Sequence, residues 1–160
     1  MSSAYLTALG LLARRDLSEQ QVRQRLRVKG HGADDIDAAV VQLREERAID
    51  DARVAEAIAR TATSVKRRGK LRVRREIESA GIASTIARQA VDSVFENVDD
   101  DELIEAALRR RLRAGRTIAD EREFQRLFRY LMAQGFETDR ILSALNARRG
   151  PGAAARDDHE

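Results

Sequence analysis

A glycine flanked by a fixed pattern of apolar residues occurs three times in the chain, and this feature constrains the fold most. The three glycines are Gly30, Gly81 and Gly135, which lie 51 and 54 residues apart. The residues eight and four positions before each glycine, and six and ten positions after it, are all apolar. Only 42% of the chain is apolar. The pattern therefore favours an internal repeat over chance periodicity in a helical protein rich in alanine and leucine.

Each copy of the repeat predicts two helices separated by a glycine turn. Apolar residues four positions apart share one face of a helix, so the patterned residues should be buried. Glycine should end the first helix in the left-handed conformation, because it has no Cβ atom to clash. A polar residue that follows, Asp34, Ser84 or Thr138, should cap the second helix. The twelve patterned residues are Val22, Leu26, Ile36, Val40, Val73, Ile77, Ala87, Val91, Leu127, Leu131, Ile141 and Leu145.

Over the whole chain, the spacing predicts an all-α fold of about nine helices in three groups of three. Because 36% of residues are charged and 4% are aromatic, we expect an elongated array in which each unit packs on its neighbour, without one large core. The expected domains are three-helix repeats at residues 1–48, 49–98 and 99–150, followed by a disordered tail at 151–160. The first expected helix ends near residue 15. Three more begin at residues 50, 99 and 120, and the other five span residues 18–29, 34–46, 70–80, 84–96 and 138–149. We expect a loop or a frayed helix end over 61–69.

Composition narrows the class of protein. The chain has 160 residues, a formal net charge of +3 and a sequence pI of about 9.8. It contains no cysteine, so disulfides and thiolate metal sites are excluded. The apolar stretch near the N-terminus lacks the layout of a secretory signal, and no stretch approaches a membrane span. We expect a cytoplasmic monomer without a cofactor.

The strongest candidate site is basic. Seven of the ten residues at 66–75 are lysine or arginine and none is acidic. Three arginines there lie 13, 9 and 6 positions before Gly81, and three more lie at the same distances before Gly135, whereas the first repeat has Leu17, Gln21 and Gln24. Arginine suits phosphate or carboxylate contacts because its planar fork donates two parallel hydrogen bonds. The candidate residues are Lys66, Arg67, Arg68, Lys70, Arg72, Arg74, Arg75, Arg122, Arg126 and Arg129.

The other interpretation of these arginines is a solvated helix surface, paired in part with Glu76, Glu78 or Glu123. Aromatic residues that could stack on bases are nearly absent, which argues against single-strand binding by stacking. Backbone phosphates or an acidic protein surface are better matches.

The remaining motifs give weaker signals. The arginines at 109–111, 113 and 116 have a simple interpretation as favourable charges near a helix C-terminus. Four acidic residues at 99–102 are more typical of helix capping than of a metal site. Gly69 and Lys70 resemble the end of a phosphate-binding loop, but Ser64 and Leu71 replace required residues. His31 is interpreted as a loop residue. No nucleophile–base pair or carboxylate pair is recognisable, so we predict no catalytic residues and a protein that is not an enzyme.

Several segments together resemble the RecX family of regulatory proteins. They are residues 12–18, 26–30, 48–55, 67–70 and 77–82, and residues 124–136 are similar to the third repeat of the family. The resemblance covers roughly residues 6–149. This sequence departs from the family at Arg47, where glycine is usual, and at Val54 and Ile58, where aromatic residues are expected.

The resemblance implies a curved, elongated molecule of three tandem three-helix units. It implies binding to the RecA recombinase filament on single-stranded DNA, with inhibition of its ATPase, strand-exchange and co-protease activities. The basic residues would then contact an acidic filament surface, DNA phosphates or both, and a weak direct contact with single-stranded or duplex DNA stays open. One alternative is a direct DNA-binding module of the helix-turn-helix type. Another is a helical scaffold for an unrelated acidic protein.

Overall fold

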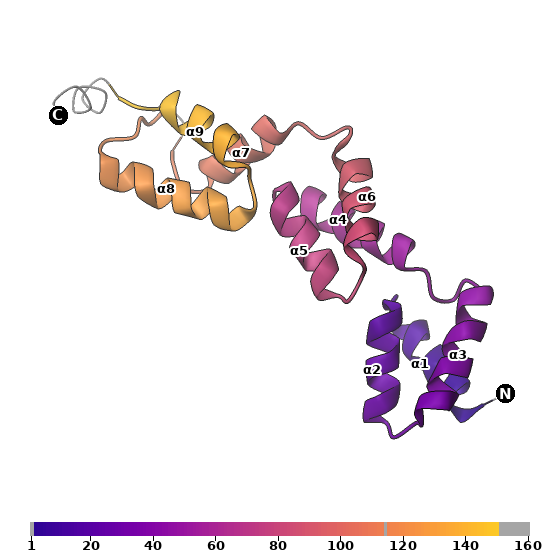
Figure 1. Cartoon of the computed structure of the whole chain (residues 1–160). Coiled ribbons are helices and arrows are strands. Elements are labelled where there is room, and N and C mark those ends of the chain that lie inside the picture. Colours follow the sequence, from indigo (N-terminus) through magenta and orange to yellow (C-terminus); the bar gives the residue numbers. More distant parts are fainter. Residues whose placement is uncertain (1, 114, 151–160) are drawn as a thin grey trace. The chain divides into compact units, whose positions relative to one another are not determined.

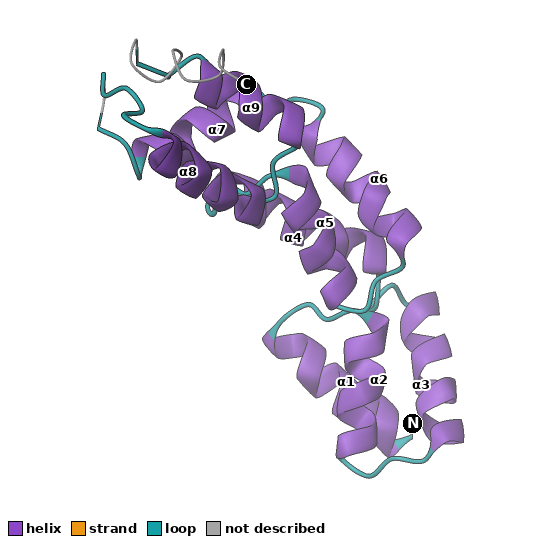
Figure 2. Cartoon of the chain, turned by 60° about the vertical axis from the view of Figure 1, so that its left-hand side comes forward, coloured by secondary structure: helices purple, strands orange, loops and turns teal. Residues whose placement is uncertain are grey.

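The computed structural model describes residues 2–113 and 115–150, and this part of the chain contains nine α-helices and no strand (Figures 1 and 2). The predicted tail at 151–160 lies outside the described residues. The only strand-like pairing within them is an isolated parallel bridge between Ile118 and Arg149. The helices are α1 (Ser3–Arg14), α2 (Glu19–Val28), α3 (Ala33–Glu45), α4 (Asp51–Ser64), α5 (Lys70–Ser79), α6 (Ser84–Phe95), α7 (Asp100–Arg109), α8 (Glu121–Gln134) and α9 (Thr138–Asn146).

The chain packs as two compact units. The first unit contains Met1–Arg60 and Arg74–Val94, and the second contains Thr61–Val73 and Phe95–Glu160. In the first unit, α1, α2 and α3 each contact the other two around one apolar core. In the second unit, α7, α8 and α9 do the same around another core. The three-helix group is therefore the local building block.

All twelve patterned residues are buried, which confirms the predicted register. The most exposed of them is Val91, with 4% of its surface accessible. Burial of a side chain of this size contributes about 1.5–3 kcal/mol, so the apolar pattern supplies much of the driving force for each group. Ile104 belongs to the same kind of core and is fully buried, although the sequence pattern did not single it out.

The predicted glycine turns are also confirmed. Gly30, Gly81 and Gly135 have φ angles of 89°, 81° and 94°, in the left-handed region that residues with a Cβ atom rarely adopt. After α2, the N–H of His31 donates to the carbonyl of Leu26 at 3.1 Å and that of Gly30 donates to Arg27 at 3.0 Å. The equivalent bonds follow α8. These pairs of bonds satisfy the last carbonyls of each helix.

The predicted caps are correct at some helix starts and wrong at others. Ser18 and Gln21 form the expected capping box at α2, and Asp50, Asp99 and Asp120 accept backbone N–H groups at α4, α7 and α8. The residues predicted as caps after the glycines lie instead inside the first turn of α3, α6 and α9. The caps of α3 and α9 are Gly32 and Glu137, and neither accepts a hydrogen bond through a side chain.

The predicted loop over 61–69 is partly wrong, because α4 continues to Ser64. Ala62 and Thr63 are buried on this last turn, so burial extends the helix beyond the predicted end. The helix then closes on Arg67, which has φ of 53°, and the N–H of Arg68 donates to the carbonyl of Ala62 at 2.9 Å.

Helices α2, α5 and α8 are the middle helices of the three groups, and α2 meets the end of α5 within the first unit. The hydroxyl of Ser18 donates to the carbonyl of Ala80, and the N–H of Glu19 donates to Asp51 Oδ1 at 2.9 Å. A Cβ atom added to Gly81 would lie 2.7 Å from the Cβ of Gln20. The first joint is therefore the start of α2 packed on the glycine turn after α5.

A second joint with the same pairing occurs within the second unit. The N–H groups of Gly69 and Leu71 donate to the carbonyls of Gln134 and Gly135 at 2.8 and 3.1 Å. Gly69 lies twelve positions before Gly81, as Ser18 lies twelve before Gly30, so equivalent residues make equivalent contacts. The free N–H groups at the start of one helix thus satisfy free carbonyls at the end of another.

The third middle helix begins differently. Asp120 Oδ1 accepts from the N–H of Glu123 at 2.8 Å, and Glu123 Oε2 accepts from the N–H of Ala119 at 3.0 Å. Helix α8 has 14 residues, whereas α2 and α5 each have 10. Two N–H groups at the start of α8 and just before it are therefore satisfied by local side chains.

Gly69→Ala should destabilise the second unit. A Cβ atom at residue 69 would lie 2.5 Å from the carbonyl carbon of Gly135 and 2.7 Å from the N of Phe136. These are backbone atoms that cannot rotate away, so we expect a loss of about 1–3 kcal/mol in the free energy of unfolding. Chemical denaturation measures this loss. Gly10→Ala is the matched control, because a Cβ atom there meets nothing within 4 Å; equal stability of the two variants would contradict the assignment.

Arg47→Gly should stabilise the protein. Arg47 follows the end of α3 with φ of 56°, in the left-handed region that glycine adopts without strain. A left-handed conformation costs a residue with a Cβ atom about 1–2 kcal/mol, so glycine should raise the free energy of unfolding by about 1 kcal/mol. Glu45→Gly, in the last helical residue of α3, should lower it by about 0.5–1 kcal/mol instead. A destabilised Arg47→Gly variant in the same denaturation experiment would show that the turn carries no such strain.

Candidate arginine-rich interface

The basic stretch at 66–75 begins in the short turn between α4 and α5. Lys66 and Arg67 are exposed, and Arg68 is half-buried. The left-handed conformation of Arg67 turns the chain toward α5. Burial lowers the pKa of the Arg68 guanidinium, and the nearby positive charge of Arg72 lowers it further. Arg68 is therefore already crowded by protein and by like charge.

Lys70 is part of an internal ion cluster. Its Nζ atom lies 3.7 Å from Asp100 Oδ2 and 5.7 Å from the centroid of the Phe95 ring. Asp100 is also 3.7 Å from the Nε of Arg140, and only 11% of its side chain is accessible. A lysine held between a carboxylate and an aromatic ring stabilises the fold, and the predicted contact of Lys70 with a partner stays a prediction.

Arg72 belongs to the second joint. Its Nη1 donates to the carbonyl of Ala133 at 3.2 Å, near the C-terminus of α8. A Cβ atom at Gly135 would lie 2.9 Å from the Cα of Arg72. A cation at a helix C-terminus also interacts favourably with the helix dipole. Arg72 therefore contributes to the fold, and its predicted contact with a partner stays a prediction.

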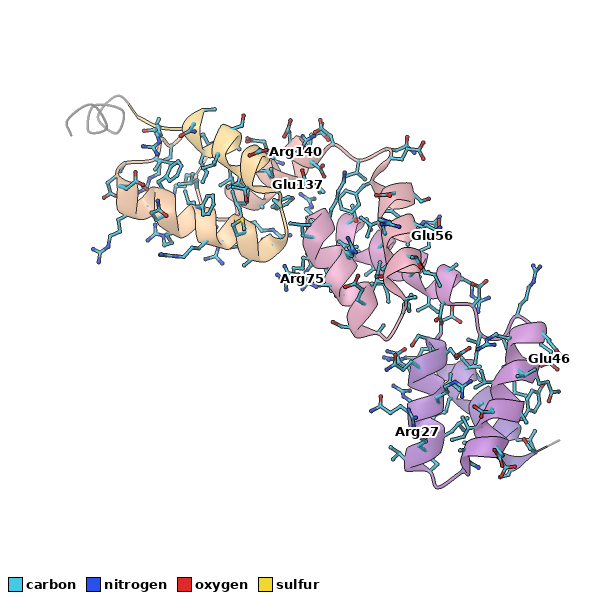
Figure 3. All side chains as sticks on the ribbon, viewed as in Figure 1. Arg27, Glu46, Glu56, Arg75, Glu137 and Arg140 are labelled. Carbon is cyan, nitrogen blue, oxygen red and sulfur yellow. The ribbon has the colours of Figure 1, made fainter. Side chains whose placement is uncertain are left out.

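The last two residues of the basic stretch lie on α5 within the first unit. Arg74 Nε is 3.1 Å from Glu78 Oε1, one helical turn away. Arg75 is exposed on α5, where Figure 3 labels it. The predicted pairing with Glu78 is thus correct for Arg74.

The second predicted group forms one exposed face of α8, which we name the α8 arginine face. It consists of Arg122, Arg126 and Arg129, spaced four and three positions apart, and all three are exposed. Arg126 lies 4.0 Å from Glu123, but 72% of its side chain is accessible. Within the described residues, Arg122 and Arg129 have no ion pair. The rise of a helix places the first and last of the three about 10 Å apart along its axis.

The acidic residues at 99–102 have structural roles. Asp99 caps α7, and Asp101 pairs with Arg140 at 3.1 Å. That hydrogen bond raises the pKa of Arg140, and the charge of Asp100 raises it further. Figure 3 labels Arg140 at the start of α9. The described residues contain no group of three or more histidine, aspartate or glutamate side chains arranged to hold a metal.

Two features of this surface were not predicted from the sequence. One is the set of internal contacts made by Arg72 and Lys70, which no signal in the sequence indicates because equivalent positions use different chemistry at the two joints. The other is an open groove of about 800 Å³ between the end of α4 and α7, lined by Thr63, Arg67, Leu103 and Arg109 among others. The Thr63 hydroxyl is buried there without a hydrogen-bond partner.

The three groups of helices match three related family models. The first three-helix domain of RecX matches residues 4–43, the second matches residues 50–91 and the third matches residues 99–145. No helix in the described part of the chain has the length and apolar character needed to span a membrane.

Proteins named regulatory protein RecX are similar to this chain over most of its length. Regulatory protein RecX of Chromohalobacter salexigens is 34% identical over 139 residues, which are 86% of this chain and 88% of that protein. Regulatory protein RecX of Halorhodospira halophila is 31% identical over 154 residues, which are 96% of this chain and 88% of that protein.

Solved structures share the fold. The crystal structure of RecX from Lactobacillus salivarius has a TM-score of 0.75 at 20% identity, and the match covers 90% of this chain and 93% of that one. A second crystal structure, of regulatory protein RecX, has a TM-score of 0.73 at 21% identity, and the match covers 90% of this chain and 70% of that one. With family models matching all three groups of helices, this chain belongs to the RecX family of regulatory proteins.

Proposed function

We propose that this protein binds the RecA recombinase filament on single-stranded DNA and inhibits its ATPase, strand-exchange and co-protease activities. It acts in the cytoplasm by stoichiometric binding, as a regulator and not as an enzyme. The observation that carries the proposal is family membership through all three repeats. Tandem repeats suit a filament, because several modest contacts on one chain add up to tight binding.

The α8 arginine face supports an anionic surface as the binding partner. Its three guanidinium groups lie on one side of a helix and are exposed. Each can donate two parallel hydrogen bonds to a carboxylate or a phosphate. Acidic side chains of the recombinase and phosphates of the DNA both present such acceptors, and the curved arrangement expected of the repeats stays a prediction.

The direct test is the ATPase rate of RecA on single-stranded DNA as this protein is added. We expect the rate to fall in a saturable manner as the protein approaches the concentration of filament subunits. An unchanged ATPase rate at a several-fold molar excess of this protein would refute inhibition. Failure of this protein to sediment together with the filament would refute binding.

Replacing Arg122, Arg126 and Arg129 together by alanine should weaken inhibition. Each charge-assisted hydrogen bond contributes about 1.5–3 kcal/mol, so the concentration for half-maximal inhibition should rise at least about tenfold. The variant should keep its helical circular dichroism, because the three side chains are exposed. Arg72 is less suitable, since its loss would also disturb the second joint.

The matched control removes the same charge from other exposed positions, Arg88, Arg110 and Arg113. This second triple variant should inhibit about as well as the unchanged protein. Equal weakening by both triple variants would mean that net charge, and not the α8 arginine face, governs binding.

Direct DNA binding is a second candidate function, because the α8 arginine face is exposed on a helix of a three-helix unit. That function predicts tight binding to duplex DNA without RecA, falling steeply as salt increases. The regulatory function predicts weak binding to DNA alone. Titration against duplex and single-stranded oligonucleotides at two salt concentrations separates the two: tight duplex binding that the alanine variant of α8 abolishes would favour direct recognition.

A further inference from the structure

Among the described residues nothing packs on the glycine turn after α2, unlike the other two glycine turns. A Cβ atom added to Gly30 would meet no atom within 4 Å, whereas Gly81 and Gly135 each lie against the start of another middle helix. Within the described residues, no hydrogen bond reaches the carbonyl oxygens of Lys29 or Gly30. The glycine turn is thus covered by the start of another helix in the second and third repeats and is uncovered in the first.

The two occupied turns define the chemistry that such a turn accepts. In each joint the occupant is the first turn of a helix, which donates an N–H or a hydroxyl to the carbonyls at the turn. The start of a helix carries free N–H groups and partial positive charge, and the end of a helix carries free carbonyls and partial negative charge. The open turn after α2 offers carbonyls of the same kind.

A groove beside the open turn adds specificity. It has a volume of about 460 Å³ and lies between α1 and α2. Its apolar residues are Leu11 and Val28, and 82% of the Val28 surface is accessible. The lining is completed by Gln21, Gln24, Arg25 and Lys29.

The charged rim of the groove is cationic. Arg25 and Lys29 have no ion pair among the described residues. Arg27, labelled in Figure 3, is an exposed third cation on α2. The free N–H groups at the start of a helix complement the open carbonyls. Glutamate or aspartate, which are favoured in the first turn of helices, complement this cationic rim.

Gln21 and Gln24 differ in chemistry from the residues at the equivalent positions of the other two repeats. They occupy the positions that hold Arg72 and Arg75 in the second repeat and Arg126 and Arg129 in the third. Amides beside an exposed valine suit a peptide surface better than they suit phosphates, because they carry no charge and pack on apolar groups. The first repeat therefore presents a different chemistry on the equivalent face.

We infer that the turn after α2 and its groove bind the acidic first turn of a helix from a protein partner, with one large aliphatic side chain seated between Leu11 and Val28. The bound helix occupies the position that α2 holds on the turn after α5, and that α5 holds on the turn after α8. The inference does not depend on the proposed function, because it concerns a different surface and can be tested with a peptide.

The test uses the full chain labelled with ¹⁵N and a short synthetic helical peptide that begins Ser-Glu-Glu-Leu. We expect the largest chemical-shift changes at the amides of Leu11, Gln24, Val28 and Gly30. Val28→Asp should weaken binding about tenfold, the size expected from losing one buried valine contact. Val28 is almost fully exposed, so the substitution leaves the core intact.

Controls separate this site from general charge attraction. Val65→Asp changes an equally apolar residue that is 69% exposed in the second unit, and it should leave peptide affinity unchanged. A peptide with its acidic residues moved to the C-terminal end should bind about tenfold more weakly. Equal binding of both peptides, shift changes centred on the α8 arginine face, or no shift changes would each overturn the inference. Shift changes on concentrating the protein without peptide would do the same, since a second copy would then occupy the turn.

Discussion

The contact between the start of one middle helix and the glycine turn of the next is the interaction on which this fold depends. The groups α1–α3 and α7–α9 each have a small apolar core, so such a group alone has little surface to bury. The joints supply the missing contacts by pairing free N–H groups with free carbonyls. Gly81 and Gly135 allow this pairing, because a Cβ atom at either residue would collide with the helix that packs on it. Glycine therefore both ends one helix and leaves room for the start of another helix to pack on that end.

The sequence predicted the helices, the buried residues and the glycine turns because each depends on local spacing. It did not predict the joints, because equivalent positions use different chemistry: a serine hydroxyl at residue 18 and a backbone N–H at Gly69. The caps of α3 and α9 were misassigned for a related reason. Asp34 and Thr138 have the right chemistry, but the apolar face fixes where each helix starts. The left-handed conformation of Arg47 was not predicted.

The arginines illustrate what sequence alone cannot separate. Arg72 and Arg126 occupy equivalent positions in two repeats, yet Arg72 donates to a carbonyl of α8 and Arg126 is exposed. The difference arises because α5 packs on another glycine turn, whereas the start of α8 is capped by its own residues. Membership of a repeat gave the position of each arginine, and the packing of its neighbours determined whether its charge stabilises the fold or stays accessible.

The cap at Asp120 has a consequence for the pairing of middle helices. Helix α8 is the middle helix of the last group, and its leading N–H of Glu123 is already satisfied. The equivalent N–H in the second repeat, that of Gly69, instead donates to the carbonyl of Gln134. The Asp120 carboxylate thus takes up the backbone donor that would otherwise link one helix to the glycine turn of another.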